Sequence, residues 1–184
     1  MLLSWIVTLF LLHTKLAHCL DIGVDNGGPQ GTWGKLDSCP AGTLARGFEL
    51  LVESFQGPLD DTALNGIRLF CAKPNEHVAV AYITSKIGNW GTWSASQWCP
   101  HGNIISFSLQ VELFGILDNT AANNIQFLCS DGTILTGYGG PWGSYGGWSQ
   151  ACPDGIRGIT AKVEDPQGKE KDDTALNDVL FRCY

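Results

Sequence analysis

The chain has little positive charge. It carries 11 Lys and Arg residues against 18 Asp and Glu residues, which gives a formal net charge of −7 at pH 7. A protein with this balance is not drawn electrostatically to nucleic acid or to anionic lipid, because both are negatively charged. We therefore expect no nucleic-acid partner, and we expect any ligand to be neutral or cationic.

The usual sequence signals of an enzyme or a metal site are also scarce. The chain has 4 histidines, and only His77 and His101 lie beyond position 19, in dissimilar contexts. No GxSxG elbow and no HExxH motif occurs, and no Cys/His spacing matches a zinc site. We predict no catalytic residue, no metal ion and no cofactor; the sequence leans against an enzyme without excluding one.

Long apolar runs are missing, apart from one at the start of the chain. Residues 2–12 form an uncharged, mostly apolar run that has signal-peptide length and is too short to span a bilayer. Ala17 and Cys19 occupy the −3 and −1 positions of a cleavage site. We expect a signal peptide at 1–19, a single secreted, extracellular domain at 20–184 and no membrane association.

What the chain does contain is a threefold internal repeat. After the leader, six cysteines alternate between a CPxG motif and the end of an apolar stretch, as in "IRLFC", "IQFLC" and "VLFRC". A hexamer, "DDTALN", then "DNTAAN", then "DDTALN" again, begins eleven residues before each second cysteine. Upstream of the first cysteines stand "GTWG", "GTWS" and "GGWS". Such self-similarity predicts three structural units, at about 31–71, 91–129 and 146–183.

Apolar and polar residues alternate in each unit. Residues 48–53, 107–112 and 159–164 read "FELLVE", "FSLQVE" and "ITAKVE", and one parity is apolar throughout. A period of two is typical of half-buried β-strands. No amphipathic helix is evident, and 23 glycines punctuate the short alternating runs. The chain is therefore predicted to be all-β, with a pseudo-threefold internal repeat.

The repeated hexamer is interpreted as a structural turn. Asp and Asn side chains accept hydrogen bonds from nearby backbone N–H groups. A register slip of one residue would move the apolar side chains of the following strand to the solvent face of the sheet. Asp60, Asp118 and Asp172 should therefore hold equivalent turns. Calcium binding is the weaker alternative, because the spacing does not match an EF-hand loop. Replacing Asp60 by Ala should cost about 1–2 kcal/mol of stability.

An even number of cysteines in a secreted chain indicates a disulfide framework. Threefold repetition leaves two regular patterns, pairing within each unit or pairing from one unit to the next. We prefer the first, because each unit then closes its own sheet without the chain ends having to meet. The expected disulfide bonds are Cys39–Cys71, Cys99–Cys129 and Cys152–Cys183.

Tryptophans among glycines allow two interpretations. Trp33, Trp93 and Trp148 can plug the ends of the core, or they can present flat faces on which sugar rings stack. Trp90 and Trp142 are less regular and are better candidates for an exposed surface that differs between sheets. Because variable loops on a rigid scaffold usually carry binding sites, we expect any ligand site to be single and to lie on a loop or at an end of the fold.

Taken together, these motifs resemble the vitelline membrane outer layer protein I family. The "GxW" segments before the cysteines, the hexamer series, "GIRLFC" and "FLCSDG" carry the resemblance over nearly the whole chain after the leader. The resemblance implies a β-prism, in which three Greek-key sheets surround an apolar core. It also implies that relatives have a further cysteine pair at the positions of Arg157 and Tyr184, which this chain lacks.

Three functions are compatible with the sequence. The first, which the resemblance favours, is a non-catalytic structural component of an extracellular matrix, coat or secretion of the egg vitelline membrane type. The second is a carbohydrate-binding β-prism module with oligosaccharides as partners. The third is a lysozyme-like transferase acting on chitin-type oligosaccharides, for which the threefold repeat supplies no distinct acid–base pair. Basic secreted proteins are further candidate partners for an acidic chain, and a monomer is expected.

Overall fold

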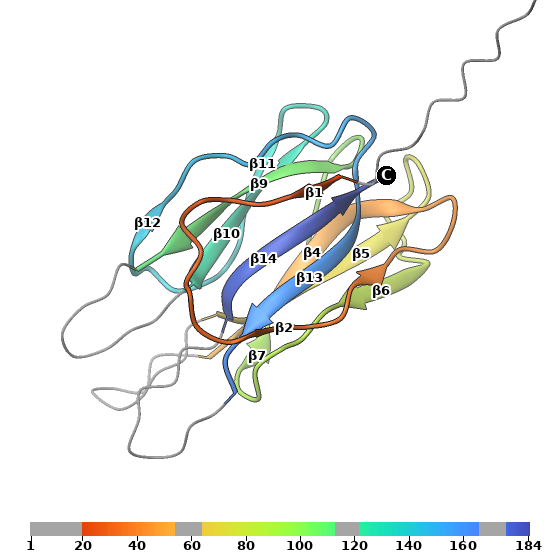
Figure 1. Cartoon of the computed structure of the whole chain (residues 1–184). Coiled ribbons are helices and arrows are strands. Elements are labelled where there is room, and N and C mark those ends of the chain that lie inside the picture. Colours follow the sequence, from red (N-terminus) through yellow and green to blue (C-terminus); the bar gives the residue numbers. More distant parts are fainter. Residues whose placement is uncertain (1–19, 54–63, 113–121, 166–175) are drawn as a thin grey trace, which may run out of the picture.

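The computed structural model describes residues 20–53, 64–112, 122–165 and 176–184. All regular elements in these ranges are β-strands, arranged in three sheets (Figure 1). The strands are β1 (Asp21–Ile22), β2 (Thr32–Trp33), β3 (Asp37–Ser38), β4 (Leu44–Val52), β5 (Leu64–Ala72), β6 (Ala81–Thr84), β7 (Thr92–Trp93), β8 (Gln97–Trp98), β9 (Ile104–Val111), β10 (Ala122–Cys129), β11 (Ile134–Thr136), β12 (Ser144–Tyr145), β13 (Ile156–Val163) and β14 (Leu176–Cys183). The prediction of an all-β chain is confirmed.

Each sheet has the same Greek-key order. In sheet I, β4, β5 and β6 are neighbours in sequence, and β7 returns to pair with β4, as does β8. Sheet II repeats this order with β9, β10, β11 and β12. Sheet III repeats it with β13, β14, β1 and β2, and β3 also pairs with β13. Sheet III therefore joins the two ends of the described chain and closes the prism.

The inward faces of the three sheets form one apolar core. The alternating positions predicted from sequence supply it: Phe48, Phe107 and Ile159 are each at most 1% exposed. The ring centroids of Phe48 and Phe127 lie 4.7 Å apart, and those of Phe127 and Phe181 lie 5.4 Å apart, both edge-to-face. One chain of aromatic contacts therefore runs through sheets I, II and III, a geometry that adds to the gain from burial.

The three disulfides tie neighbouring sheets together. The bonds are Cys39–Cys71, Cys99–Cys129 and Cys152–Cys183, the pairing expected from the sequence. The reason for that choice was wrong, however. The Cys39 N–H donates to the Arg157 carbonyl of sheet III, whereas Cys71 belongs to β5 of sheet I. Cys99 and Cys152 are held in the same way by the preceding sheet, so the three bonds link the sheets in a ring.

The last residue of each hexamer forms a β-bulge. In sheet I, the pairing with β4 skips Asn65, which lies between Leu64 and Gly66. The pairing skips Asn123 in β10 and Asn177 in β14 in the same manner. All three asparagines are buried. A bulge bends the strand and changes which way its side chains point, so this position sets the register of the strand that follows.

The carbonyl groups of these bulge residues also anchor the loops. They accept hydrogen bonds of 2.6–2.7 Å from the N–H groups of Gly88, Gly140 and Gly28. The first four positions of every hexamer, including Asp60, Asp118 and Asp172, lie outside the described residues. Their role as turn residues therefore stays a prediction.

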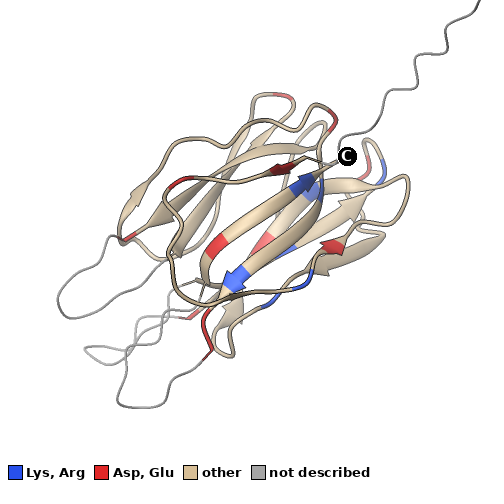
Figure 2. Cartoon of the chain, in the orientation of Figure 1, with Lys and Arg blue, Asp and Glu red and all other residues tan. Residues whose placement is uncertain are grey.

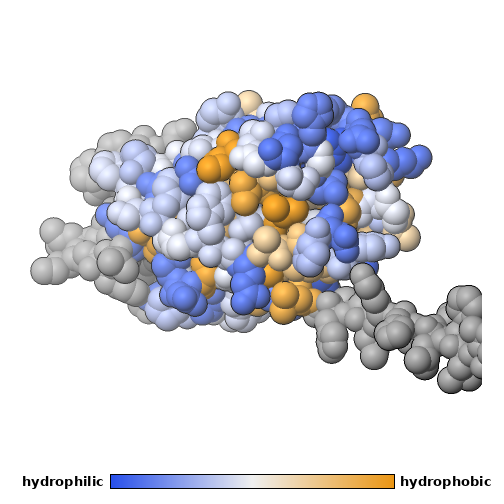
Figure 3. Space-filling model, turned by 90° about the horizontal axis from the view of Figure 1, so that it is seen from above, coloured by the Kyte–Doolittle hydropathy of each residue, from blue (hydrophilic) through white to orange (hydrophobic). Residues whose placement is uncertain are grey.

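Polar and apolar surface are unevenly distributed. Charged residues are sparse: both signs occur on sheets I and III, whereas the strands of sheet II carry none (Figure 2). Seen from above, apolar residues form a band between hydrophilic groups (Figure 3). In the part of the chain that is described, no helix is long and apolar enough to cross a membrane.

Candidate functional site

The three sheets meet at three seams, each formed by corresponding segments. On one side of a seam lies an outer strand, β6, β11 or β1. On the other side lies the segment that precedes a first cysteine, namely residues 35–38, 95–98 or 147–150. These segments correspond because Asp37, Gln97 and Ser149 stand opposite equivalent residues of β13, β4 and β9.

Side chains at corresponding positions bridge two of the seams. At the first seam, Asp37 Oδ2 accepts a hydrogen bond of 3.2 Å from the Thr84 N–H. At the second, Gln97 Nε2 donates to the Thr136 carbonyl. Thr84 and Thr136 are themselves equivalent, because each ends the outer strand of its sheet. These two seams are therefore closed by contacts between neighbouring sheets.

The third seam has no such bridge among the described residues. Ser149 stands where Asp37 and Gln97 stand in the other seams, but its side chain is shorter and turns inward. Its Oγ lies 3.2 Å from the Phe107 N–H and 3.1 Å from Ser106 Oγ. The position equivalent to Thr84 is Gly23, which follows β1 and has no side chain. In the other two seams the partner is the backbone of this residue, so the short side chain of Ser149 leaves the third seam unbridged.

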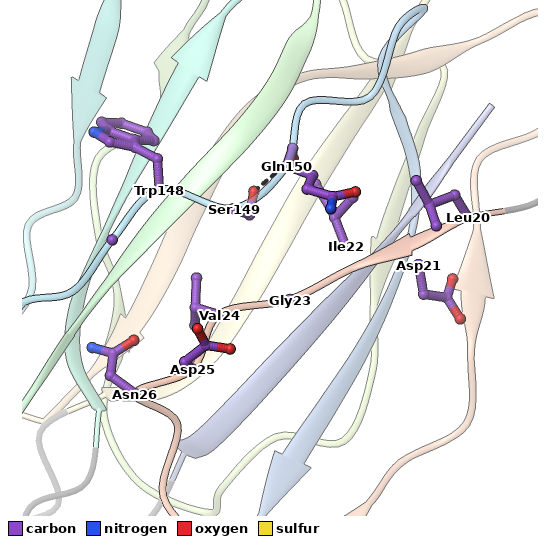
Figure 4. A pocket seen from close by; sticks show the side chains of 11 residues that line it. Leu20, Asp21, Ile22, Gly23, Val24, Asp25, Asn26, Trp148, Ser149 and Gln150 are labelled. Carbon is purple, nitrogen blue, oxygen red and sulfur yellow. Dashed lines mark hydrogen bonds between the residues drawn. The ribbon is translucent and has the colours of Figure 1, made fainter.

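The backbone widens this seam further. The stretch from Ile22 to the anchoring Gly28 is one residue longer than its counterparts in the other two sheets, which run to Gly88 and Gly140. The extra residue lengthens the chain between β1 and its anchor at Gly28. A groove of about 570 Å³ opens between residues 20–26 and 147–150 (Figure 4).

Apolar and polar groups both line the groove. Ile22 is only 2% exposed and belongs to the core, so it forms an apolar base. Trp148 and Gln150 come from one wall, and Val24 and Asp25 come from the other (Figure 4). Trp148 is 43% exposed, and its ring rises from this wall at the rim of the groove (Figure 4).

Asn26 closes one end of the groove. Its Nδ2 donates a hydrogen bond of 2.9 Å to the Leu109 carbonyl of β9, which connects the two sheets at this point. The side chain packs on Gly146, where a Cβ would come within 2.5 Å of Asn26 Cγ. Its Oδ1 is buried and accepts no hydrogen bond from the described protein. The end of the groove thus holds a buried acceptor.

The charge of the groove is negative. Asp21 is paired with Arg182, whose Nε and Nη2 each donate a hydrogen bond of 2.8 Å to it. This hydrogen bonding is the main cause that holds the pKa of the Asp21 carboxyl below its usual value, and it outweighs the opposing effect of burial. Asp25 is exposed. Among the described residues that line the groove, none is Lys or Arg.

The comparisons with known proteins agree with this architecture. Residues 21–184 match the Vitelline membrane outer layer protein I (VOMI) family. The chain belongs to this family. It is 45% identical over 175 residues to "Vitelline membrane outer layer protein 1 homolog" of Mus musculus, covering 94% of this chain and 87% of the relative. It is 50% identical over 165 residues to the Homo sapiens protein of the same name, covering 88% and 81%.

Solved structures show the same β-prism fold in lectins. An artocarpin–mannopentose complex has a TM-score of 0.53 and 14% identity, covering 90% of the VOMI chain and 98% of that chain. A mannose-specific jacalin-related lectin from Morus nigra, in complex with mannose, has a TM-score of 0.51 and 15% identity, covering 92% and 96%. At such low identity the likeness shows the fold alone, and it agrees with the three Greek-key sheets of this VOMI chain.

The predicted tryptophans do not form one site in the VOMI chain. Trp93 lies against the Arg68 guanidinium at 3.8 Å from the ring centroid, and Trp33 lies 6.0 Å from Lys162 Nζ. Trp90 and Trp142 are exposed away from the groove lining. Of the five predicted tryptophans, Trp148 alone lines the groove.

The alignment of Trp148 with Trp33 and Trp93 was wrong. Tyr145 of β12 pairs with β9 in the same way as Trp33 pairs with β13 and Trp93 with β4. The segment equivalent to "GTWG" is therefore "GSYG", residues 143–146. Its first glycine has a positive φ of 78°, as Gly31 does at 81°. The glycines at both ends of "GSYG", which match those of "GTWG", were the signal that could have identified this segment.

Sequence reasoning missed the other residues of the groove. Asp21, Asn26 and Gln150 belong to no repeated motif, and they become neighbours only because the chain ends meet in sheet III. Within the described ranges, no group of three or more His, Cys, Asp or Glu side chains could hold a metal ion.

Proposed function

We propose that this VOMI-family protein is a secreted, non-catalytic structural component of an extracellular coat or secretion. The observation that carries the proposal is the ring of three disulfides, each of which ties one sheet to the next. Structural disulfides form and persist in oxidising compartments. In the chain-entropy model, each closed loop of this length contributes about 3–4 kcal/mol, which suits a protein that must last outside the cell.

Secretion is tested with the full chain expressed in a secretory cell line. We expect the protein in the medium with Leu20 at its N-terminus and no cysteine that reacts with a thiol reagent before reduction. Recovery inside the cell with reactive thiols would contradict the proposal. The structural role is tested by mixing the purified protein with isolated egg vitelline coats and with mucus. Retention in the sedimented coat or gel after washing is the expected result.

A second candidate function is carbohydrate binding. The fold is shared with β-prism proteins whose structures contain mannopentose or mannose, and one of the three seams in this chain forms a groove. Titration calorimetry against a panel of neutral oligosaccharides tests it. Saturable binding supports this function, and the absence of heat with every sugar at millimolar concentration contradicts it.

Transfer of chitin-type oligosaccharides is not favoured by the groove. Such chemistry uses one carboxylic acid and one carboxylate in different environments. The groove offers Asp21 and Asp25, and Asp21 is already paired with Arg182. Mass spectrometry of chito-oligosaccharides incubated with the protein should show an unchanged length distribution.

A further inference from the structure

We propose that the open seam between sheets II and III is a binding site for neutral oligosaccharides, with Trp148 as the surface on which a pyranose ring stacks. The inference rests on the second candidate function and gives it a place in the molecule. It does not depend on whether the protein reaches an extracellular coat.

The groove has the size and the surface that a sugar requires. Small-molecule sites usually enclose about 300–1,000 Å³ and combine apolar walls with a few polar groups, and this groove encloses about 570 Å³. A pyranose has a C–H face and a rim of hydroxyl groups. The C–H face suits the exposed ring of Trp148 at the rim, while Ile22 and Val24 supply apolar surface at the base and the opposite wall.

Polar groups stand where the hydroxyl rim would lie. Asn26 Oδ1 is buried at the end of the groove without a partner in the described protein. A buried acceptor without a donor is unfavourable, and a sugar hydroxyl that donates to Asn26 Oδ1 would remove that penalty. The carboxylate of Asp25 is a further acceptor, and the exposed amide of Gln150 can both donate and accept.

The charge of the site selects against acidic sugars. Asp21 and Asp25 both line the groove, and the pairing of Asp21 with Arg182 keeps the Asp21 carboxyl ionised. Arg182 offsets the charge of Asp21, but a sialylated or sulfated glycan would bring a negative charge close to the carboxylate of Asp25. The site should therefore prefer neutral sugars.

The number of sites follows from the broken threefold symmetry. The Asp37–Thr84 and Gln97–Thr136 bridges occupy the places that Ser149 and Gly23 leave open. Because these bridges close the first two seams, one molecule should bind one sugar chain, at the third.

The site can be removed by changes that leave the fold intact. Trp148→Ala deletes the stacking surface, and Trp142→Ala is its matched control, because Trp142 is similarly exposed at 48% but lies outside the groove. Gly147→Phe fills the groove; an added Cβ at Gly147 meets no atom within 4 Å. Ser149→Gln places a glutamine where Gln97 bridges the second seam, so it should close the third.

The experiment is calorimetry of the full-length secreted protein with three probes: tetra-N-acetylchitotetraose, mannopentaose and sialyllactose. We expect at least one neutral probe to bind with a stoichiometry of one, and sialyllactose to bind at least ten-fold more weakly. Trp148→Ala, Gly147→Phe and Ser149→Gln should each weaken binding about ten-fold or more, while Trp142→Ala leaves the affinity unchanged. Thermal melts of all four variants check that each one is folded.

Several results would overturn the inference. The absence of binding to both neutral probes would reject the inference together with the second candidate function. If a neutral oligosaccharide binds and neither Gly147→Phe nor Trp148→Ala weakens that binding, the carbohydrate-binding function would stand and the groove would be rejected as its site. A preference for sialyllactose, or a stoichiometry of three, would also reject the proposal.

Discussion

The Arg182 guanidinium donates a hydrogen bond of 2.8 Å to each oxygen of the Asp21 carboxylate. The two residues pair directly across β14 and β1, so the ion pair holds the short strand β1 against β14. Because β1 forms one wall of the groove, this ion pair supports the candidate site as well as the fold.

The first prediction concerns this pair and its dependence on pH. The folded-state pKa of Asp21 lies below its unfolded value, chiefly because of the hydrogen bonds from Arg182. The stabilisation is therefore present above the unfolded pKa of about 3.9 and is lost as the pH falls through the folded pKa. For a pair this exposed, Asp21→Asn should cost at most about 1 kcal/mol at pH 7.

Thermal melts of Asp21→Asn and the unaltered chain test this at pH 7 and at pH 2.5. The difference in Tm should shrink at the lower pH, and it should also shrink in concentrated salt, which screens exposed ion pairs. A difference that stays constant in both series would show that the effect does not come from the charge.

The second prediction concerns Asp178 of β14. Burial raises the pKa of its carboxyl and outweighs both the hydrogen bond from the Val179 N–H and the attraction of Lys162. Because the folded pKa is raised, the free energy of unfolding falls as the pH rises from the unfolded pKa to the folded pKa. Asp178→Asn should therefore increase the free energy of unfolding at pH 7 and give no increase at pH 3.

Sheet II shows that an asparagine fits this position. Asn124, the residue equivalent to Asp178, accepts a 2.9 Å hydrogen bond from the Ile125 N–H, as Asp178 does from Val179 at 2.8 Å. Urea denaturation at the two pH values measures the effect. A loss of stability at pH 7 would show that the negative charge of Asp178 is favourable, contrary to the prediction.

The third prediction tests the bulge at the end of the hexamer. A Cβ at Gly88 would lie 2.2 Å from Asn65 Oδ1, and Asn65 is only 1% exposed. The asparagine has little room to move, so Gly88→Ala should destabilise the fold by about 1–3 kcal/mol through overpacking. Gly147→Ala is the control, since it meets no neighbouring atom, and its effect should stay within about 0.5 kcal/mol. Equal effects of the two changes would contradict the tight packing of the bulge.

The fourth prediction concerns the positions at which relatives are expected to carry a further cysteine pair. Arg157 lies with its guanidinium carbon 5.5 Å from the centroid of the Tyr184 ring, so a cation–π contact stands in the place of a covalent bond. The double change Arg157→Cys, Tyr184→Cys should form a disulfide and raise the free energy of unfolding by up to about 3 kcal/mol in the chain-entropy model. Melts with and without a reducing agent measure the gain, and free thiols in the folded double variant would refute it.

The sequence by itself determined the features that depend on neighbours along the chain. Strand parity is such a feature: residues of one parity at Phe48, Phe107 and Ile159 are buried because a β-strand turns alternate side chains to one face. The repeated spacing of the cysteines also reduced the regular pairings to two, one of which forms, although the reason for preferring it was wrong.

The tertiary structure alone decided how units that look alike come to differ. Residues before Cys39 join β13 from the far end of the chain, so the disulfides link sheets, a relationship that no local pattern records. The groove arises in the same way. No sequence pattern marks Ser149 or Gly23 as part of a binding site. They leave a seam open only because folding places them opposite each other, at the positions that Asp37 and Thr84 occupy in the first seam. Repetition fixes what the three units share, whereas a cavity depends on the contacts between segments that are distant in sequence.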